Sequence, residues 1–347
     1  MMWLTWRQFR AQAIAGAAAL AVLAIVLAVT GLHLAHLFDS SGVATCQVHG
    51  DCGPLVSAFT QQVQAGGYKV LFNLTIALLL VTPALIGIFW GAPLVTREIE
   101  AGTFRLAWNQ SVTRVRWLAV KLGLIGLASI ATAGLLTLMV SWWAGPIDRA
   151  GALPAGRNGT TGLNRFVPVL FDARGIVPIG YAAFAFALGI TAGVLVRRTV
   201  PAMAITLAVF AAVQIVMPLW IRPHLIAPVH ASSAFNPANL TEISSTNNGR
   251  MTVAAAVNLP GAWVLANQTL NPAGHVFTGP APAACMGNTT SMNACQDALG
   301  RLGLRQYVTY QPAGRYWAFQ GYETGIFVVL ALGLAAGCVW RVRRRAF

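Results

Sequence analysis

Two acidic residues lie in a short charged segment between two long apolar stretches. The segment reads Arg97-Glu98-Ile99-Glu100-Ala101-Gly102-Thr103-Phe104-Arg105, and it is called the charged segment below. Carboxylates on the surface of such a segment can form salt bridges with arginines of a protein partner. Salt bridges of this kind orient a complex and set its specificity more than they add affinity. The pattern therefore favours docking of a partner over catalysis.

Catalytic and nucleotide-binding motifs are missing from the sequence. It contains no G-x-x-x-x-G-K-[ST] loop for nucleotide phosphates and no G-x-S-x-G turn for a nucleophilic serine. The segments expected in the cytoplasm are too short for a nucleotide-binding domain. We therefore expect that the chain is not an enzyme and carries no cofactor, and that any ATP and magnesium it uses are bound by a partner subunit.

The composition indicates an integral membrane protein. Of 347 residues, 56% are hydrophobic and 9% charged, and the mean hydropathy is +0.64. The formal net charge of +14 does not indicate nucleic-acid binding, because the cations stand beside apolar stretches rather than on a polar domain. Six stretches reach the roughly 20 residues that a membrane-spanning helix needs, namely Ala13–Leu37, Val70–Leu94, Leu118–Trp143, Ile176–Val196, Val200–Trp220 and Tyr322–Trp340.

Arginines orient these six spans. Cations gather before the first span, after the second, between the fourth and fifth, and after the last. Since cytoplasmic loops carry the excess of Lys and Arg, both termini are predicted to be cytoplasmic. The predicted fold is an all-α, multi-pass protein of the plasma membrane with a small extracellular domain between its fifth and sixth helices.

The predicted domains follow from these spans. Residues 1–12 precede the first span on the cytoplasmic side, and residues 13–220 hold the first five spans. Residues 221–319 form the extracellular domain, and residues 320–347 form the sixth span and a basic tail.

Cysteines and histidines concentrate on the predicted outer side. Pairing Cys46 with Cys52 and Cys285 with Cys295 closes loops of about ten residues or fewer, which costs little chain entropy. Free thiols or exchanged partners are the alternative. The i, i+3 pair His33 and His36 could bind a metal, but interfacial histidines without a ligand are the simpler interpretation, and we predict no metal site.

The acids are distributed unevenly. Glu98 and Glu100 are the two assigned to the cytoplasm, and the other seven are placed outside or at the outer edge of the membrane, at Asp39, Asp51, Asp148, Asp172, Glu242, Asp297 and Glu323. Carriers driven by ion gradients keep ionisable groups inside the bilayer. Because no acid is expected in the middle of a span, ion-coupled transport is the weaker hypothesis.

The charged segment is predicted to lie parallel to the membrane. Gly102 and Thr103 would end a short helix, and Glu98 and Glu100 on that helix would face the cytosol, where they could enter a groove of a cytoplasmic protein. The alternative is a solvated turn whose acids balance neighbouring arginines and contribute almost nothing to stability.

This part of the sequence resembles the type-2 ABC-transporter permeases, the membrane subunits of ATP-binding-cassette exporters. Those proteins share an R-E-x-E-x-G-T run, then a Ser/Pro-Val-Ser/Thr-Arg turn and a lysine in the next span. The matching residues are Arg97, Glu98, Glu100, Gly102, Thr103, Ser111, Val112, Thr113, Arg114 and Lys121. Phe104 to Trp108 depart from the leucine-rich version of the family.

The resemblance implies how the protein is driven. It implies a cytoplasmic interfacial helix over residues 1–12 and a cytoplasmic coupling helix at about 95–113. The coupling helix would bind ABC ATPase subunits, two per complex, with a second copy of this chain or a similar permease completing the assembly. Arg97, Glu98, Glu100, Gly102, Thr103, Phe104 and Arg105 are then the ATPase-coupling residues. Spans without fixed charges fit a hydrophobic or amphipathic cargo such as a drug, peptide or lipid. A membrane sensor or scaffold that uses the same ATPase without transport is the alternative function.

Overall fold

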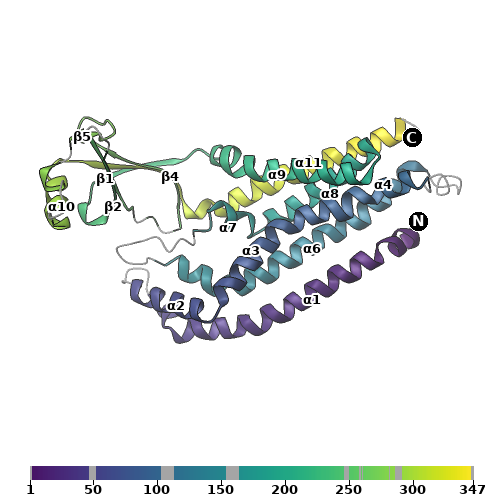
Figure 1. Cartoon of the computed structure of the whole chain (residues 1–347), viewed down its shortest axis with the longest axis horizontal. Coiled ribbons are helices and arrows are strands. Elements are labelled where there is room, and N and C mark those ends of the chain that lie inside the picture. Colours follow the sequence, from purple (N-terminus) through teal and green to yellow (C-terminus); the bar gives the residue numbers. More distant parts are fainter. Residues whose placement is uncertain are drawn as a thin grey trace.

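The computed structural model describes residues 2–46, 52–102, 113–153, 164–245, 250–257, 259, 261–280, 282–285 and 291–344. Within these ranges, six helices are long and apolar enough to cross a membrane, as the sequence predicts. They are Phe9–Ser40, Tyr68–Glu100, Arg114–Gly151, Val177–Val196, Thr199–His224 and Ala313–Arg344. The amino and carboxyl termini lie at the same end of the bundle, which we call the terminal end (Figure 1).

The first helix is longer than its apolar span. α1 runs without a break over Met2–Ser40, because no proline interrupts these residues. Residues 2–12 are helical and continue directly into the first span, so the helix predicted for residues 1–12 forms the first turns of α1. Cytoplasmic placement of these turns stays a prediction.

The second span changes its hydrogen-bond pattern along its length. α3 (Tyr68–Leu85) leads through a π-helical stretch, η2 (Ile86–Gly91), into α4 (Ala92–Glu100). A second π-helical stretch, η3 (Met217–Ile221), ends the fifth span after α9 (Thr199–Val216). Prolines lie near both stretches, at Pro83, Pro93 and Pro218, and they remove backbone donors that a regular α-helix would use.

α8 (Val177–Val196) is the central helix of the bundle. It contacts α11 (Tyr316–Arg344), α6 (Arg114–Gly151), α9 and the second span, and 72% of its span is buried, against 6% for α1. Small residues allow this packing: a Cβ atom on Gly87 of η2 would lie 2.7 Å from the Ala185 carbonyl oxygen. Backbones that approach this closely are typical of helix packing in membranes.

Two short helices complete the helical part. α2 (Gly53–Ala65) lies at the end of the bundle opposite the termini, and α7 (Pro168–Asp172) precedes α8 (Figure 1). The predicted disulfide Cys46–Cys52 is confirmed and joins the 3₁₀ turn η1 (Val43–Thr45) to the start of α2. Cys338 is a buried free thiol within α11.

A strand-rich region lies between α9 and α11, at the end opposite the termini (Figure 1). One antiparallel sheet has the order β1-β6-β4, and the other has the order β2-β3-β5. The strands are β1 (Val229–Ala234), β2 (Leu240–Ser245), β3 (Arg250–Ala255), β4 (Trp263–Leu270), β5 (Gly279–Pro280) and β6 (Arg305–Gln311). The all-α prediction is corrected by these two sheets; that this region is extracellular stays a prediction.

The strand-rich region has a core of its own. Met251 and Val253 of β3 pack with Phe277 and with Leu299 of α10 (Met292–Gly300). The predicted disulfide Cys285–Cys295 is confirmed, and Cys295 is part of this core. Such a staple helps a unit with a small apolar core remain folded.

Candidate functional site

The charged segment begins inside α4. This helix ends at Glu100, and Gly102 follows with a left-handed φ of 66°, so the predicted helix end is confirmed. Arg97 is exposed and lines a groove of about 240 Å³ between α1 and the second span. Thr103, Phe104 and Arg105 lie outside the described residues, as does most of the predicted coupling helix.

Glu98 is held by α6. Its Oε1 atom lies 2.6 Å from Lys121 Nζ, and the Trp117 indole donates a hydrogen bond of 3.1 Å to its Oε2 atom. Lys121 also donates to the Leu94 carbonyl oxygen at 3.2 Å. The side chains of Lys121 and Glu98 are only 3% and 13% exposed. The prediction that Glu98 faces the cytosol is therefore wrong, because a lysine in the bundle wall needs a counter-charge.

Glu100 caps the first turn of α9. The Thr199 backbone N–H donates to Glu100 Oε1 at 2.9 Å, and the Thr199 hydroxyl donates to Oε2 at 2.7 Å. The first N–H groups of a helix lack partners within the helix, and its dipole favours an anion there. Arg197, whose φ is 59°, makes the tight turn from α8 that brings Thr199 to this position. Glu100 is exposed, but it is hydrogen-bonded within the chain.

The two acids therefore connect α4 to two different helices. We call the group of Glu98, Glu100, Trp117, Lys121 and Thr199 the α4 clamp. Glu98 fixes α4 to α6, which starts after the charged segment, and Glu100 fixes α4 to the start of α9. A displacement at the end of α4 would consequently reach both helices.

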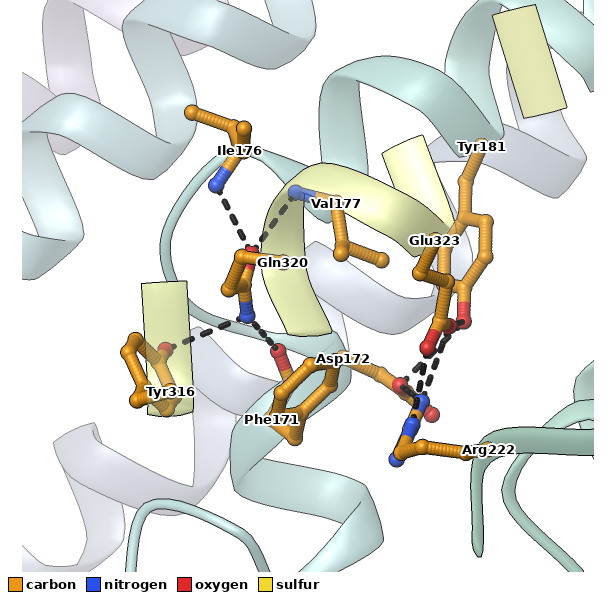
Figure 2. Close-up of polar contacts among 9 residues, drawn as sticks. All are labelled: Phe171, Asp172, Ile176, Val177, Tyr181, Arg222, Tyr316, Gln320 and Glu323. Atoms are coloured by element: carbon orange, nitrogen blue, oxygen red, sulfur yellow. Dashed lines mark hydrogen bonds and ion pairs between the residues drawn. The ribbon is translucent and has the colours of Figure 1, made fainter. Parts of the chain in front are cut away.

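A second polar cluster lies deep between helices and was missed by sequence reasoning (Figure 2). The Arg222 guanidinium donates through Nε to Glu323 Oε2 at 2.8 Å and through Nη2 to Glu323 Oε1 at 2.9 Å. Nη2 also donates to Asp172 Oδ1. Arg222 and Glu323 are fully buried. We call Asp172, Tyr181, Arg222 and Glu323 the Arg222 cluster.

Tyr181 closes the Arg222 cluster from α8. Its hydroxyl lies 3.2 Å from Asp172 Oδ1 and is also hydrogen-bonded to Glu323. The Arg222 guanidinium stacks over the Phe171 ring, with Cζ 4.0 Å from the ring centroid. Burial raises the pKa of Asp172 to about 6, against the effect of Arg222. The cluster therefore joins α7, α8, the end of the fifth span and α11.

Gln320 adds a neutral connection beside the Arg222 cluster (Figure 2). Its Oε1 atom accepts hydrogen bonds of 3.0 Å from the N–H groups of Ile176 and Val177, at the start of α8. Its amide nitrogen donates to the Phe171 carbonyl oxygen at 3.1 Å. α11 is thus hydrogen-bonded to the segment that leads into α8.

The sequence placed Asp172 and Glu323 outside or at the outer edge of the membrane, and this placement stays a prediction; their burial among neighbouring helices was not predicted. Glu323 belongs to α11 and is buried by its neighbours, while Asp172 ends α7 and points into the same cluster. A signal was available: Arg222 directly follows an apolar span, and a cation buried there requires acids nearby. Across the described ranges, no three His, Cys, Asp or Glu side chains are grouped so that they could hold a metal ion.

Comparisons with known proteins identify the family. No curated protein and no solved structure matches the chain significantly. A family model described as ABC-2 membrane transporter related matches residues 17–222. The match begins within α1 and ends at Arg222, so it covers the first five spans and stops before the strand-rich region. Because it covers more than half of the 347 residues, the chain belongs to the ABC-2 membrane transporter related family.

Proposed function

We propose that the chain is the membrane permease subunit of an ATP-driven ABC exporter of the plasma membrane. It moves a hydrophobic or amphipathic cargo, such as a drug, peptide or lipid, and takes its energy from two separate ATPase subunits that hold ATP and magnesium. A second copy of the chain or a similar permease completes the complex. Family membership and six apolar helices support this proposal.

The α4 clamp is the observation that carries the coupling part of the proposal. The ATPase docks on the segment of about residues 95–113, and Glu98 and Glu100 hold the α4 end of that segment against α6 and α9. We infer that these acids position the docking segment rather than enter the ATPase groove. Movement of the ATPases would pass through Lys121 to α6 and through Thr199 to α9.

A co-purification experiment tests the docking surface. The chain is purified with its ATPase, and Phe104→Glu with Trp108→Glu should release the ATPase because both changes fall in the docking segment. Glu98→Arg with Glu100→Arg should also weaken binding, through loss of the α4 clamp. Trp317→Glu is the matched control, since Trp317 is 63% exposed and lies at the start of α11. Undiminished ATPase binding in the Phe104 and Trp108 variant would contradict the assignment.

The proposal that the complex moves a cargo is tested by a transport assay in membrane vesicles. The complex should hydrolyse ATP faster when cargo is added and should accumulate that cargo across the membrane. The isolated chain should not hydrolyse ATP. Stimulated hydrolysis without accumulation would favour the second candidate function below.

The second candidate is a membrane sensor that moves the strand-rich region without carrying cargo. The Arg222 cluster favours it, because the chain enters the strand-rich region next to Arg222 and leaves it through the helix that contains Glu323. Arg222 lies at the end of the fifth span, shortly before β1, and Glu323 lies in the helix that follows β6. β1 and β6 are paired directly, so a shift of α11 against the fifth span would reach the paired strands.

A further inference from the structure

Three helices enclose a cavity near the end of the bundle that is opposite the termini. The cavity has a volume of about 260 Å³ and lies between α2, α3 and the end of α6. Each helix contributes residues spaced three or four apart, which lie on one helical face. Phe59 and Val63 come from α2, Phe72 from α3, and Ile147 and Ala150 from α6.

The floor of the cavity is apolar and firmly held. Val56, Phe59, Val63, Phe72, Ile147 and Ala150 are buried and form this floor. The buried Arg174 guanidinium packs over the Phe72 ring, with Cζ 5.3 Å from the ring centroid, and Arg174 Nε lies 3.5 Å from Asp148 Oδ2. The floor can therefore receive a hydrocarbon chain without burying a polar group.

Among the described residues, the rim of the cavity is polar and carries one charge, that of Lys69. Thr60, Gln64, Lys69 and Asn73 line it, and Lys69 and the two amides are exposed. No carboxylate of the described residues forms an ion pair with Lys69. Lys69 stands in the first turn of α3, where the helix dipole also attracts anions. The rim thus suits a small anionic group with hydrogen-bond acceptors.

The volume of the cavity fits a single alkyl chain. Pockets for small molecules typically measure about 300 to 1,000 Å³, so this cavity, at about 260 Å³, is slightly smaller than that range. It holds part of one alkyl chain and has no room for the second chain of a phospholipid. One lysine at the rim matches one negative charge.

We propose that this cavity binds a long-chain fatty acid, with its carboxylate at Lys69 and its alkyl chain on the apolar floor between α2, α3 and α6. The described lining lies at the end of the bundle opposite the termini, away from the end of α4 where the ATPase is proposed to dock, so fatty-acid binding should not require the ATPase (Figure 1). Its occupant would be drawn from the membrane, since α3 and α6 are membrane-spanning helices.

Photolabelling with a diazirine analogue of palmitic acid tests the site in the purified full chain, held in phosphatidylcholine nanodiscs at neutral pH. Mass spectrometry should place the label on α2, α3 and the end of α6, and unlabelled palmitate should compete with it. Lys69→Gln should weaken palmitate competition about tenfold, the effect of losing one charge-assisted hydrogen bond, and Lys69→Arg should retain most of it. Hexadecanol, which has no charge, should compete equally with the wild type and with Lys69→Gln.

Matched controls make the outcome decisive. Arg149→Gln removes a cation of α6 that packs over Phe38 instead of lining the cavity, so palmitate affinity should not change. Ala150→Phe places a large side chain in the apolar floor and should abolish specific labelling. If this variant fails to fold, the Lys69 variants still test the proposal, because Lys69 is exposed and its replacement should not affect folding. Label spread evenly over α9 and α11, undiminished competition with Lys69→Gln, or phosphatidylglycerol competing as well as palmitate would each overturn the proposal.

Discussion

The α4 clamp and the Arg222 cluster use the same chemistry at opposite ends of the bundle. In the α4 clamp, Glu98 is partly exposed and Glu100 is exposed. In the Arg222 cluster, Arg222 and Glu323 are both fully buried. The clamp joins helices next to the predicted ATPase surface, and the cluster joins helices next to the strand-rich region. The difference in burial predicts that the cluster is rigid and costly to break, while the clamp can open at lower cost.

Charge balance differs between the two regions as well. Lys121 has one acid beside it, whereas Arg222 lies between two, Asp172 and Glu323. A buried ion pair gains little over well-packed apolar residues, but removal of one partner leaves an uncompensated charge. The following predictions test this contrast, beginning with the largest expected effect.

Arg222→Met should be the most destabilising of these changes. It leaves two acids buried without their cation, and loss of one partner of a buried pair typically costs about 3 to 5 kcal/mol. Unfolding of the purified protein in a detergent titration measures the loss. If the variant is as stable as the wild type, the Arg222 cluster does not hold the helices together.

The same position offers a control for charge. Arg222→Met combined with Asp172→Asn and Glu323→Gln removes every formal charge of the Arg222 cluster. This triple variant should be more stable than Arg222→Met alone, because no carboxylate remains buried without a cation. An equal or larger loss would mean that packing of the Arg222 side chain, rather than its charge, is responsible.

Glu98→Gln should destabilise the protein less than Arg222→Met. Lys121 would lose its charged partner but keep the Leu94 carbonyl oxygen, and a hydrogen bond to a charged group contributes about 1.5 to 3 kcal/mol. The same detergent titration applies. Glu242→Gln, at an exposed position of β2, should leave stability unchanged, and a similar loss in both variants would argue against a specific role of Lys121.

Much of the helical architecture could be predicted from the sequence because apolar length is a local property. The six spans are set by runs of apolar residues, the helix end by Gly102, and each disulfide by two cysteines close in sequence. The strands were harder to predict from the sequence than the helices. β1 pairs with β6 across a long stretch of sequence, and such pairing depends on partners that a local pattern does not reveal.

The buried charges escaped sequence reasoning for a related reason. Glu323 stands near the start of an apolar run, so its position along the chain resembles an interfacial acid. Its burial is produced by Arg222, which is 101 residues away, and by Tyr181, which is 142 residues away. The burial of Glu98 was missed for the same reason, since its contact with Lys121 depends on how α4 packs against α6.

As the pH is lowered, Asp172 of the Arg222 cluster should take up a proton at a higher pH than an ordinary carboxylate does. Arg222, Glu323 and Tyr181 face Asp172, and burial raises the pKa of Asp172 to about 6. The folded protein therefore binds this proton more tightly than the unfolded chain, so this group favours folding increasingly as the pH falls from about 6 toward the ordinary value of 3.8. Infrared spectra should gain a protonated-carboxyl band near pH 6, which Asp172→Asn removes. A band that persists in this variant belongs to another acid.

Glu100→Ala should have the smallest effect on global stability and a local effect on α9. It removes the two Glu100 acceptors of Thr199 and leaves Thr96 Oγ1, which lies 2.9 Å from the Thr199 hydroxyl, and the exposed site lets water replace the lost acceptors. Amide hydrogen exchange at Thr199 should become faster, while the Trp117 indole signal stays unchanged in an NMR spectrum. Glu98→Gln should shift the Trp117 indole signal and leave amide exchange at Thr199 unchanged, because Glu98 accepts the hydrogen bond of the Trp117 indole. If either change alters both signals, the α4 clamp moves as one unit, and the two acids cannot pass motion separately to α6 and α9.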